Sequence, residues 1–281
     1  MKTYYTEPKP GEELEAARCP VCGRQDTKPC WDCGSFRFAR CLGCGHVYQN
    51  PRPVQAALAE RYDDGYKQYE IESAAPFFKL MRLGLDDLGF DELEARMGPG
   101  RSFLDVGCAT GVLVRHLADR GWRAVGVELC EGSARWGIEK RGVDIRIGTL
   151  EAAAFPDASF DLIHASHLIE HLPEPGRYAD ELARILKPGG YVITVTPTTS
   201  GLQARLFGAR WRSAIADHVH LFSTPGLQRL FLERGFKIER VKTWGGLAQG
   251  YGPTWLKRPL DRLAKRWGFG DVVAILAKKA R

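Results

Sequence analysis

The chain has 281 residues, enough for one large domain and a small accessory module at about 150 residues per domain. Its residues are 44% hydrophobic and 26% charged, which excludes a mainly disordered chain, a collagen-like fibre and a multi-span membrane protein. No apolar run approaches the ~18 residues of a membrane helix, and the first residues lack the apolar core of a signal peptide, so we expect a cytoplasmic protein.

The net charge of +6 is unevenly distributed along the chain. Residues 196–281 carry 16 Lys and Arg against 5 Asp and Glu, whereas residues 1–98 (13 against 16) and 99–195 (11 against 13) are slightly acidic. A basic region confined to the last third predicts a local contact with an anionic partner rather than a uniform nucleic-acid coat.

Six of the eight cysteines lie in three Cys-x2-Cys pairs between residues 19 and 44, and each pair is followed by glycine. Two thiolates at this spacing can ligate one metal ion from a tight turn, and the 18 residues between the outer pairs suit a four-cysteine zinc site. We therefore predict a zinc ribbon with structural Zn2+. Its ligands would be Cys19, Cys22, Cys41 and Cys44.

Two questions about the cysteines stay open. A disulfide framework is the alternative to zinc, and the expected reducing compartment disfavours it. The middle pair, Cys30 and Cys33, could be a swapped ligand pair, free thiols or part of a two-metal cluster. A closed four-cysteine site has no position for substrate, so its expected role is to fold a short segment.

Breaker residues divide the chain into three predicted parts. Short strands are expected within the cysteine-rich segment, and Asn50-Pro-Arg-Pro53 ends it. Residues 54–62 and 77–97 have helical spacing, and Gly98-Pro99-Gly100 marks the main boundary. We predict a zinc-ribbon module at 1–53, a helical linker or cap at 54–98 and the main domain at 99–281.

From residue 101 apolar strands alternate with amphipathic helices, which predicts an α/β domain with a parallel sheet. The expected helices are 112–120, 132–140, 178–186 and 227–234. The expected strands are 102–106, 123–129, 144–148, 161–166, 191–196, 237–243 and 272–277.

The first strand is followed by a turn that is typical of an adenosine cofactor site. It reads Leu104-Asp-Val-Gly-Cys-Ala-Thr-Gly111, and its glycines let the backbone approach a ligand at a helix N-terminus. Glu128 ends the next strand, where a carboxylate can accept both ribose hydroxyls. The dinucleotide pattern G-x-G-x-x-G is absent, and Asp105 suits a ligand that carries an ammonium group better than a pyrophosphate.

This turn resembles the first motif of the class I S-adenosylmethionine (SAM)-dependent methyltransferases. Phe155-Pro-Asp-Ala-Ser-Phe-Asp161 and Leu186-Lys-Pro-Gly-Gly190 precede the fourth and fifth strands as in that family. The last two strands resemble the family's closing hairpin, which has no helix between them. The N-terminal ribbon resembles one fused to a bacterial subgroup of glycan and small-molecule methyltransferases. The resemblance implies a seven-stranded Rossmann-like methyltransferase sheet at 99–281 with SAM as cofactor.

The resemblance also implies a set of cofactor contacts. Glu128 would hold the ribose hydroxyls, and Leu129 would lie against the adenine. Thr149 and Leu150 stand where relatives carry an aspartate for the adenine amino group, so backbone groups or Glu151 would serve instead. Ser166, at the end of the fourth strand, completes the expected site. The residues expected along the methionine and ribose are Asp105, Gly107, Cys108 and Gly111.

Two histidine segments supply the catalytic candidates. By resemblance His167 faces the transferred methyl group and is the first candidate for a general base. His167-x-x-Glu170-His171 matches an inverted zinc-protease pattern, but that pattern requires a helix. Glu170 is a further catalytic candidate: with His171 it would either bind Mg2+ or cap the following turn. In Asp217-His-Val-His220, alternation places both histidines on one side of an extended segment, and His220 is the second catalytic candidate.

Two basic, aromatic insertions, 197–223 and 244–270, should cover the acceptor pocket. Residues 254–267 form an amphipathic stretch that could clamp a phosphate or make peripheral membrane contact. We therefore expect methyl transfer to an anionic small-molecule or glycan acceptor, at the oxygen of a phosphorylated, nucleotide-linked or lipid-linked substrate. The alternatives are an rRNA methyltransferase with a zinc module, which would bind nucleic acid, and a non-catalytic SAM-binding or docking protein.

Overall fold

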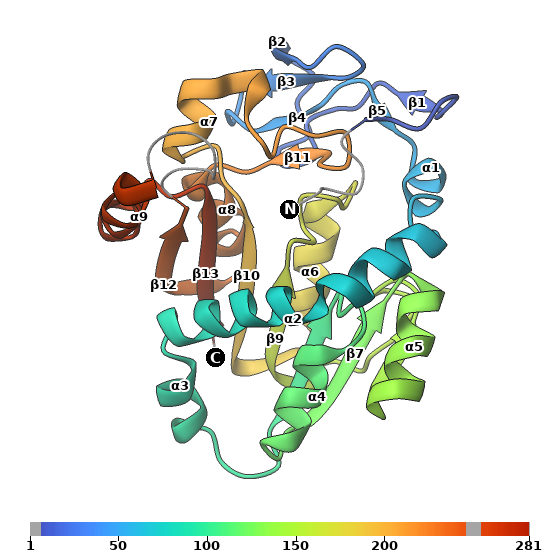
Figure 1. Ribbon diagram of the computed structural model, residues 1–281, viewed down its shortest axis with the longest axis vertical. Helices are drawn as coiled ribbons and strands as arrows, with labels where there is room; N and C mark the ends of the chain where they lie inside the picture. Colours follow the sequence, from blue (N-terminus) through green and yellow to red (C-terminus); the bar gives the residue numbers. More distant parts are fainter. Residues whose placement is uncertain (1–6, 246–253, 281) are drawn as a thin grey trace.

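The computed structural model describes residues 7–245 and 254–280. Its centre is a seven-stranded mixed sheet in the order β12-β13-β10-β9-β6-β7-β8, with helices on both faces (Figure 1). The parallel strands are β6 (Ser102–Val106), β7 (Arg123–Glu128), β8 (Asp144–Ile147), β9 (Phe160–Ser166) and β10 (Leu186–Pro197). The predicted α/β class and seven-stranded sheet are confirmed.

Burial on both faces explains why the central strands are continuously apolar. Every residue of β6 is buried, and alternate side chains enter different cores. Leu104 and Val106 pack towards α6 (Pro175–Ile185) and α8 (Thr224–Leu232). Phe103 packs with α4 (Val112–Asp119), whereas α5 (Glu131–Arg141) covers the β8 side.

The last two strands run antiparallel, but a helix separates them in the chain. β13 (Val272–Lys279) lies between β10 and β12 (Phe236–Trp244), paired antiparallel with both. Helix α9 (Thr254–Trp267) connects β12 to β13, so the expectation of a hairpin without a helix is wrong. Of the predicted insertion at 244–270, residues 246–253 lie outside the described residues. Among the residues described, no helix is long and apolar enough to span a membrane.

Residues 14–53 form the unit that we call the cysteine module. It contains β1 (Leu14–Glu15), β2 (Thr27–Asp32), β3 (Arg37–Cys41), β4 (Val47–Gln49) and β5 (Arg52–Pro53). A four-stranded sheet has the order β11-β4-β3-β2, and its strand β11 (His220–Leu221) comes from the far end of the chain. The module therefore lies over the carboxyl ends of the parallel strands (Figure 1).

Three helices join the module to the sheet. They are α1 (Gln55–Ala59), α2 (Asp64–Asp87) and α3 (Phe90–Arg96). The long helix α2 crosses one face of the molecule in front of the sheet and contacts α4 and α5 (Figure 1). It begins with the Asp63 carboxylate accepting a hydrogen bond from the Tyr66 N–H, and α3 begins after Gly89 at φ +70°. Helix α2 thus begins before the predicted helix start at 77, within the segment predicted as the cap.

Candidate active site

The turn between β6 and α4 forms a backbone cradle. Gly107 and Gly111 have φ angles of +71° and +68°. A Cβ atom on Gly111 would lie 2.8 Å from Val143 Cγ2, and one on Gly107 would lie 3.2 Å from Leu168 Cδ1. The Gly107 N–H donates to the Val127 carbonyl at 2.9 Å, which ties the turn to β7. Glycine is required here both by conformation and by space.

Glu128 is held at the end of β7 by the same turn. Its Oε2 accepts a hydrogen bond from the Ala109 N–H at 2.8 Å, and its Oε1 accepts one from the Cys130 N–H at 2.7 Å. The residue is buried, and burial raises the pKa of its carboxyl group despite these hydrogen bonds. A carboxylate in this position has acceptor capacity left for a diol.

Asp105 lies beneath the cradle, where its Oδ1 is 2.7 Å from His164 Nδ1. A small cavity of about 20 Å³ separates the turn from helix α2, and Asp105, Glu70 and Phe77 line it. Burial and the nearby Glu128 carboxylate raise the pKa of Glu70 to about 7. The Cys108 thiol packs against Gly126, so the backbone of this residue is the part that belongs to the cradle.

The remaining predicted cofactor residues follow β7, β8 and β9. Leu129 is partly exposed beside Glu128, and Leu150 is buried in the core. Thr149 Oγ1 accepts a hydrogen bond from the Ala152 N–H at 3.2 Å and so caps a turn. Ser166 is the last residue of β9, on the same sheet edge as the cradle. The structure brings these residues to one edge of the sheet.

His167 leaves β9 with a strained backbone, at φ +53°. Its N–H donates to the Val195 carbonyl at 2.8 Å, and its ring is 52% exposed. Nδ1 lies 3.2 Å from Glu170 Oε1, while Glu170 Oε2 accepts a hydrogen bond from the Thr196 hydroxyl at 2.9 Å. Burial raises the pKa of Glu170, but the His167 hydrogen bond and nearby imidazoles outweigh it and hold the pKa at about 2.

A second group of side chains surrounds Glu170. Glu170, His171 and His218 each offer a ligand atom within 4.8 Å of the others. Burial lowers the pKa of His171, but Asp217 raises it to about 9, and the His171 Nδ1 lies 2.8 Å from the Asp217 carbonyl oxygen. Two imidazoles and one carboxylate are a donor set that suits a divalent transition metal.

His220 lies in a different environment. Its ring is fully buried, with Nδ1 3.1 Å from His46 Nε2 in the cysteine module. Its backbone N–H donates to the Glu170 carbonyl at 3.0 Å. The His218 N–H closes a turn on Ile215, and the two rings have different neighbours: His218 packs against His171 and His220 against His46.

Sequence reasoning missed the partners of this loop. Arg61 is buried and donates to the Ala216 carbonyl at 3.0 Å and to Asp217 Oδ1 at 3.3 Å. Its other nitrogens donate to the Glu12 carboxylate. Asp217 stands next to a predicted histidine and could have been considered, whereas no local pattern marks Arg61 or Glu12.

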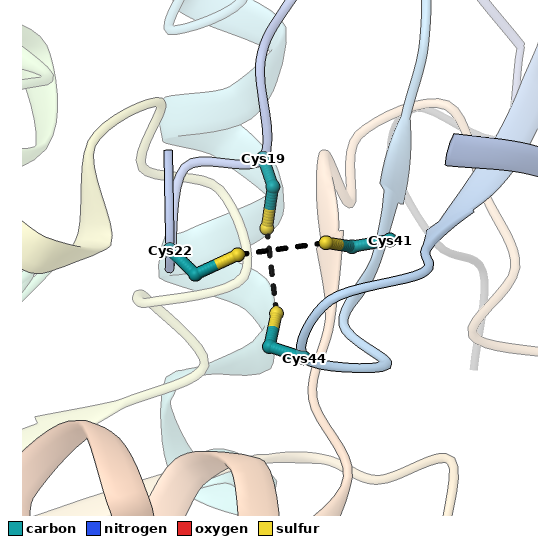
Figure 2. Close-up of side chains that lie close together, drawn as sticks. All are labelled: Cys19, Cys22, Cys41 and Cys44. Atoms are coloured by element: carbon teal, nitrogen blue, oxygen red, sulfur yellow. Dashed lines mark hydrogen bonds between the residues drawn. The ribbon is translucent and has the colours of Figure 1, made fainter. Parts of the chain in front are cut away.

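The four predicted metal-binding cysteines converge on one point. Figure 2 shows the pairs Cys19–Cys44 and Cys22–Cys41 crossing, and each pair has an Sγ–Sγ distance of 3.5 Å. Four thiolates at Zn–S distances of about 2.3 Å would be separated by roughly 3.8 Å in a tetrahedron. The donor set therefore fits a tetrahedral Zn2+ ion.

The middle cysteines do not join this cluster. Cys30 Sγ lies 3.4 Å from the Phe38 carbonyl oxygen, and Cys33 Sγ lies 3.7 Å from that of Ala209. Both pack with the aromatic cluster that includes Trp31 and Trp211. Among the described residues, the cysteines that lie close enough together to bind one metal ion are Cys19, Cys22, Cys41 and Cys44.

Only some of the aromatic and basic side chains in the insertions 197–223 and 244–270 are exposed to solvent. Trp211 is buried, and its indole donates to Asp271 rather than facing solvent. Arg205 and Leu206 of α7 (Leu202–Phe207) are exposed, as are Arg266 and Trp267 of α9. The Leu202 N–H at the start of α7 donates to the Phe269 carbonyl, two residues beyond the end of α9, at 3.0 Å.

A family model described as a methyltransferase domain matches residues 79–241. The ubiquinone biosynthesis O-methyltransferase of Hahella chejuensis is 34% identical over 162 residues, covering 55% of this chain and 64% of that relative. The Paracidovorax citrulli enzyme of the same name is 29% identical over 168 residues, covering 56% and 68%. The chain thus spans about two thirds of the length of these relatives.

Solved structures share the fold. A SAM-dependent methyltransferase from Thermotoga maritima, titled a possible histamine N-methyltransferase, has a TM-score of 0.51 at 24% identity, covering 76% of this chain and 97% of that one. A putative sarcosine dimethylglycine methyltransferase from Galdieria sulphuraria has a TM-score of 0.53 at 16% identity, covering 71% and 86%. With the family match over more than half of its length, the chain belongs to the class I SAM-dependent methyltransferases.

Proposed function

We propose that this protein transfers the methyl group of SAM to an oxygen of a small-molecule or glycan acceptor. The observation that carries the proposal is the juxtaposition, at one sheet edge, of the glycine cradle with Glu128 and of His167 with Glu170. The names of the relatives, ubiquinone biosynthesis O-methyltransferases, support oxygen as the methylated atom and a small molecule as the acceptor.

The donor groups of the cradle fit SAM. The free N–H groups at the start of α4 and the backbone of Gly107 would face the methionine part, and Asp105 would attract its ammonium group. Glu128 would accept the ribose hydroxyls, and Leu129 would lie against the adenine. When bound, SAM would supply an electrophilic methyl group on its sulfonium, and S-adenosylhomocysteine would leave as a neutral thioether.

His167 acts as the general base in this proposal. The Glu170 carboxylate accepts a hydrogen bond from Nδ1 and so leaves Nε2 free to take the acceptor's proton. The exposed ring can reach an acceptor that lies over the cradle. Glu170 also stabilises the imidazolium that forms. Positioning of the acceptor in line with the methyl group provides much of the remaining acceleration.

Two metal sites belong to the proposal. Cys19, Cys22, Cys41 and Cys44 would bind a structural Zn2+ ion, because a four-cysteine set is closed and leaves no open position for substrate. As the alternative to the His167–Glu170 pair, Glu170, His171 and His218 would hold a divalent cation, whose binding would displace the His167 hydrogen bond and the proton of His171.

The exposed basic residues of α7 and α9 favour an acceptor with a phosphate, nucleotide or lipid-linked group. Exposed Arg205 and Arg266 beside Leu206 and Trp267 combine positive charge with apolar surface. Such a surface suits peripheral contact of 254–267 with an anionic membrane that carries the acceptor.

The function is tested by titration calorimetry with SAM, using NAD as the control, followed by an acceptor panel. Catechol, UDP-glucose, glucose 6-phosphate and ribosomal RNA would each be incubated with SAM, and S-adenosylhomocysteine would be measured. We expect SAM alone to bind and a small hydroxylated acceptor to be turned over. Turnover of RNA alone would establish an rRNA methyltransferase instead, and binding without any turnover would favour a docking protein.

A further inference from the structure

The cysteine module shares a sheet with the loop that carries Asp217 and His218. Strand β4 pairs with β11, so that Tyr48 lies opposite His220 and Val47 opposite Leu221. The Gln49 N–H extends this ladder by donating to the Val219 carbonyl at 2.9 Å. The loop at 213–221 is therefore bound along its length to the module.

The side chain of Gln49 adds a second attachment. It is 2% exposed, and its Nε2 donates to the carbonyls of Ala216 at 2.8 Å and His218 at 3.0 Å. The Ile215 carbonyl lies 3.4 Å away. These carbonyls converge on one amide because the chain turns tightly at 215–218. A buried carbonyl that loses its donor costs free energy, so this amide defines the shape of the turn.

Arg61 clamps the same turn from the other side. Its guanidinium is 2% exposed and lies between the Glu12 carboxylate, 6% exposed, and the Ala216 carbonyl with Asp217. The Asp217 backbone and carboxylate in turn contact His171 Nδ1, at 2.8 and 3.3 Å. Removal of one partner from such a buried set leaves a charge or dipole uncompensated.

The cysteine cluster is close to these attachments in the chain. Gln49 follows Cys44 by five positions, and the Cys41 N–H donates to the His46 carbonyl at 2.9 Å. Tyr48 packs on Cys19 and Cys41 within the module. Ligation of the four sulfurs therefore restrains the strand that holds the loop.

We propose that the cysteine module is a positioning element of the methyl-transfer site and that Gln49 is the positioning residue through which it acts. The proposal rests on the function proposed above. Gln49 touches no substrate. It sets the turn that orients Asp217 against His171 and places the His218 ring beside Glu170.

The test compares Gln49→Met with the wild-type full chain in three measurements. Methionine keeps the size of the side chain but donates no hydrogen bond. We expect amide hydrogen exchange at 213–221 to accelerate at least tenfold and kcat with the acceptor found in the panel to fall at least tenfold. The Kd for SAM, measured by calorimetry, should stay within twofold, because the cradle is untouched.

Trp122→Phe is the matched control. It also removes one buried donor, the Trp122 indole N–H, which lies 2.6 Å from Glu94. This pair lies at the amino end of β7, whereas the cradle lies at its carboxyl end. We expect it to lower Tm while exchange at 213–221 and kcat stay within twofold of wild type. If Gln49→Met does not fold, Gln49→Leu replaces it, since leucine also removes the Nε2 donor that the Ala216 and His218 carbonyls accept from.

The possible results distinguish failure of the positioning proposal from failure of the proposed function. Unchanged exchange at 213–221 in the Gln49 variant overturns the positioning proposal whether or not an acceptor is known. Faster exchange at 213–221 with an unchanged kcat also overturns the positioning proposal. The loop would then be loosened by the substitution without any effect on catalysis. A wild-type protein that binds SAM but turns over no acceptor would overturn the proposed function, while the exchange measurement would still decide whether Gln49 holds the loop.

Discussion

His167, the candidate general base, has a strained backbone conformation. A histidine at φ +53° costs of the order of 1 kcal/mol relative to an ordinary conformation. The hydrogen bond to the Val195 carbonyl and the contact with Glu170 offset that cost. The strained turn presents the ring to solvent at the carboxyl end of β9, where open α/β sheets bind their ligands.

Substitution of this histidine tests its role as a base. We expect His167→Ala to lower kcat by 10²–10⁴-fold, the usual contribution of general base catalysis, with an unchanged Kd for SAM. His116→Ala is the control, because that imidazole lies on α4 and pairs with Arg82. A variant at 167 that keeps turnover within a few-fold, while His220→Ala abolishes it, would reverse the assignment.

Glu128 carries the prediction for cofactor binding. In Glu128→Ala the ribose loses its acceptor, and the N–H groups of Ala109 and Cys130 lose their partner. Because hydrogen bonds to charged groups contribute about 1.5–3 kcal/mol, we expect SAM affinity to fall at least tenfold in calorimetry. Glu139→Ala, an exposed carboxylate on α5, should bind SAM as wild type does. Equal affinity of both variants would remove Glu128 from the site.

At the scale of elements, α3 is joined to the sheet by a buried carboxylate. Glu94 accepts hydrogen bonds from the Trp122 indole at 2.6 Å, from Arg101 at 2.7 Å and from Arg120. Burial raises the pKa of Glu94, but the Arg120 and Trp122 hydrogen bonds outweigh it, so the pKa lies below its usual value. Folding therefore favours the ionised form.

This gives a prediction for stability against pH. Glu94→Gln should lower the free energy of unfolding by about 2 kcal/mol at pH 7, because charge-assisted hydrogen bonds become neutral ones. The native contribution is complete above the unfolded pKa of ~4.3 and is lost as pH falls through the lower folded value. Urea unfolding at several pH values should show the difference between variant and wild type shrinking below about pH 4. A constant difference would mean that ionisation of Glu94 does not matter.

The elements that could be predicted from the sequence are those whose structure depends on residues close together in the chain. The strands at 102–106 and 123–128 were predicted closely because they are short, apolar and bounded by turn residues. Helix α2 extends 13 residues before the predicted start at 77, because its first half packs against α5 and faces the cradle turn rather than showing a simple apolar stripe. The cradle residues were predicted from one contiguous motif. The partners Arg61 and Gln49 were not, because they meet the loop more than 150 residues later in the chain.

For the whole molecule, the cysteine cluster predicts a defined metal content. We expect about one zinc ion per chain by elemental analysis, and loss of that ion in Cys41→Ser with a lower Tm. Cys30→Ser is the control, since its thiol lies outside the four-sulfur cluster. Two ions per chain retained in Cys30→Ser would place the second ion at Glu170, His171 and His218. Metal lost in the control would bring the middle pair into the site.

The shared sheet also has a consequence for biosynthesis. His46 and His220 meet across the module although 174 residues separate them in the chain. The cysteines leave the ribosome early and can ligate metal, but β4 keeps an open edge until the last third of the chain has been made. An unpaired strand edge attracts other chains. Nascent or truncated chains that end before residue 220 should therefore need a chaperone that covers the edge of β4. Once β11 has been synthesised and has paired with β4, the module should no longer aggregate through this edge.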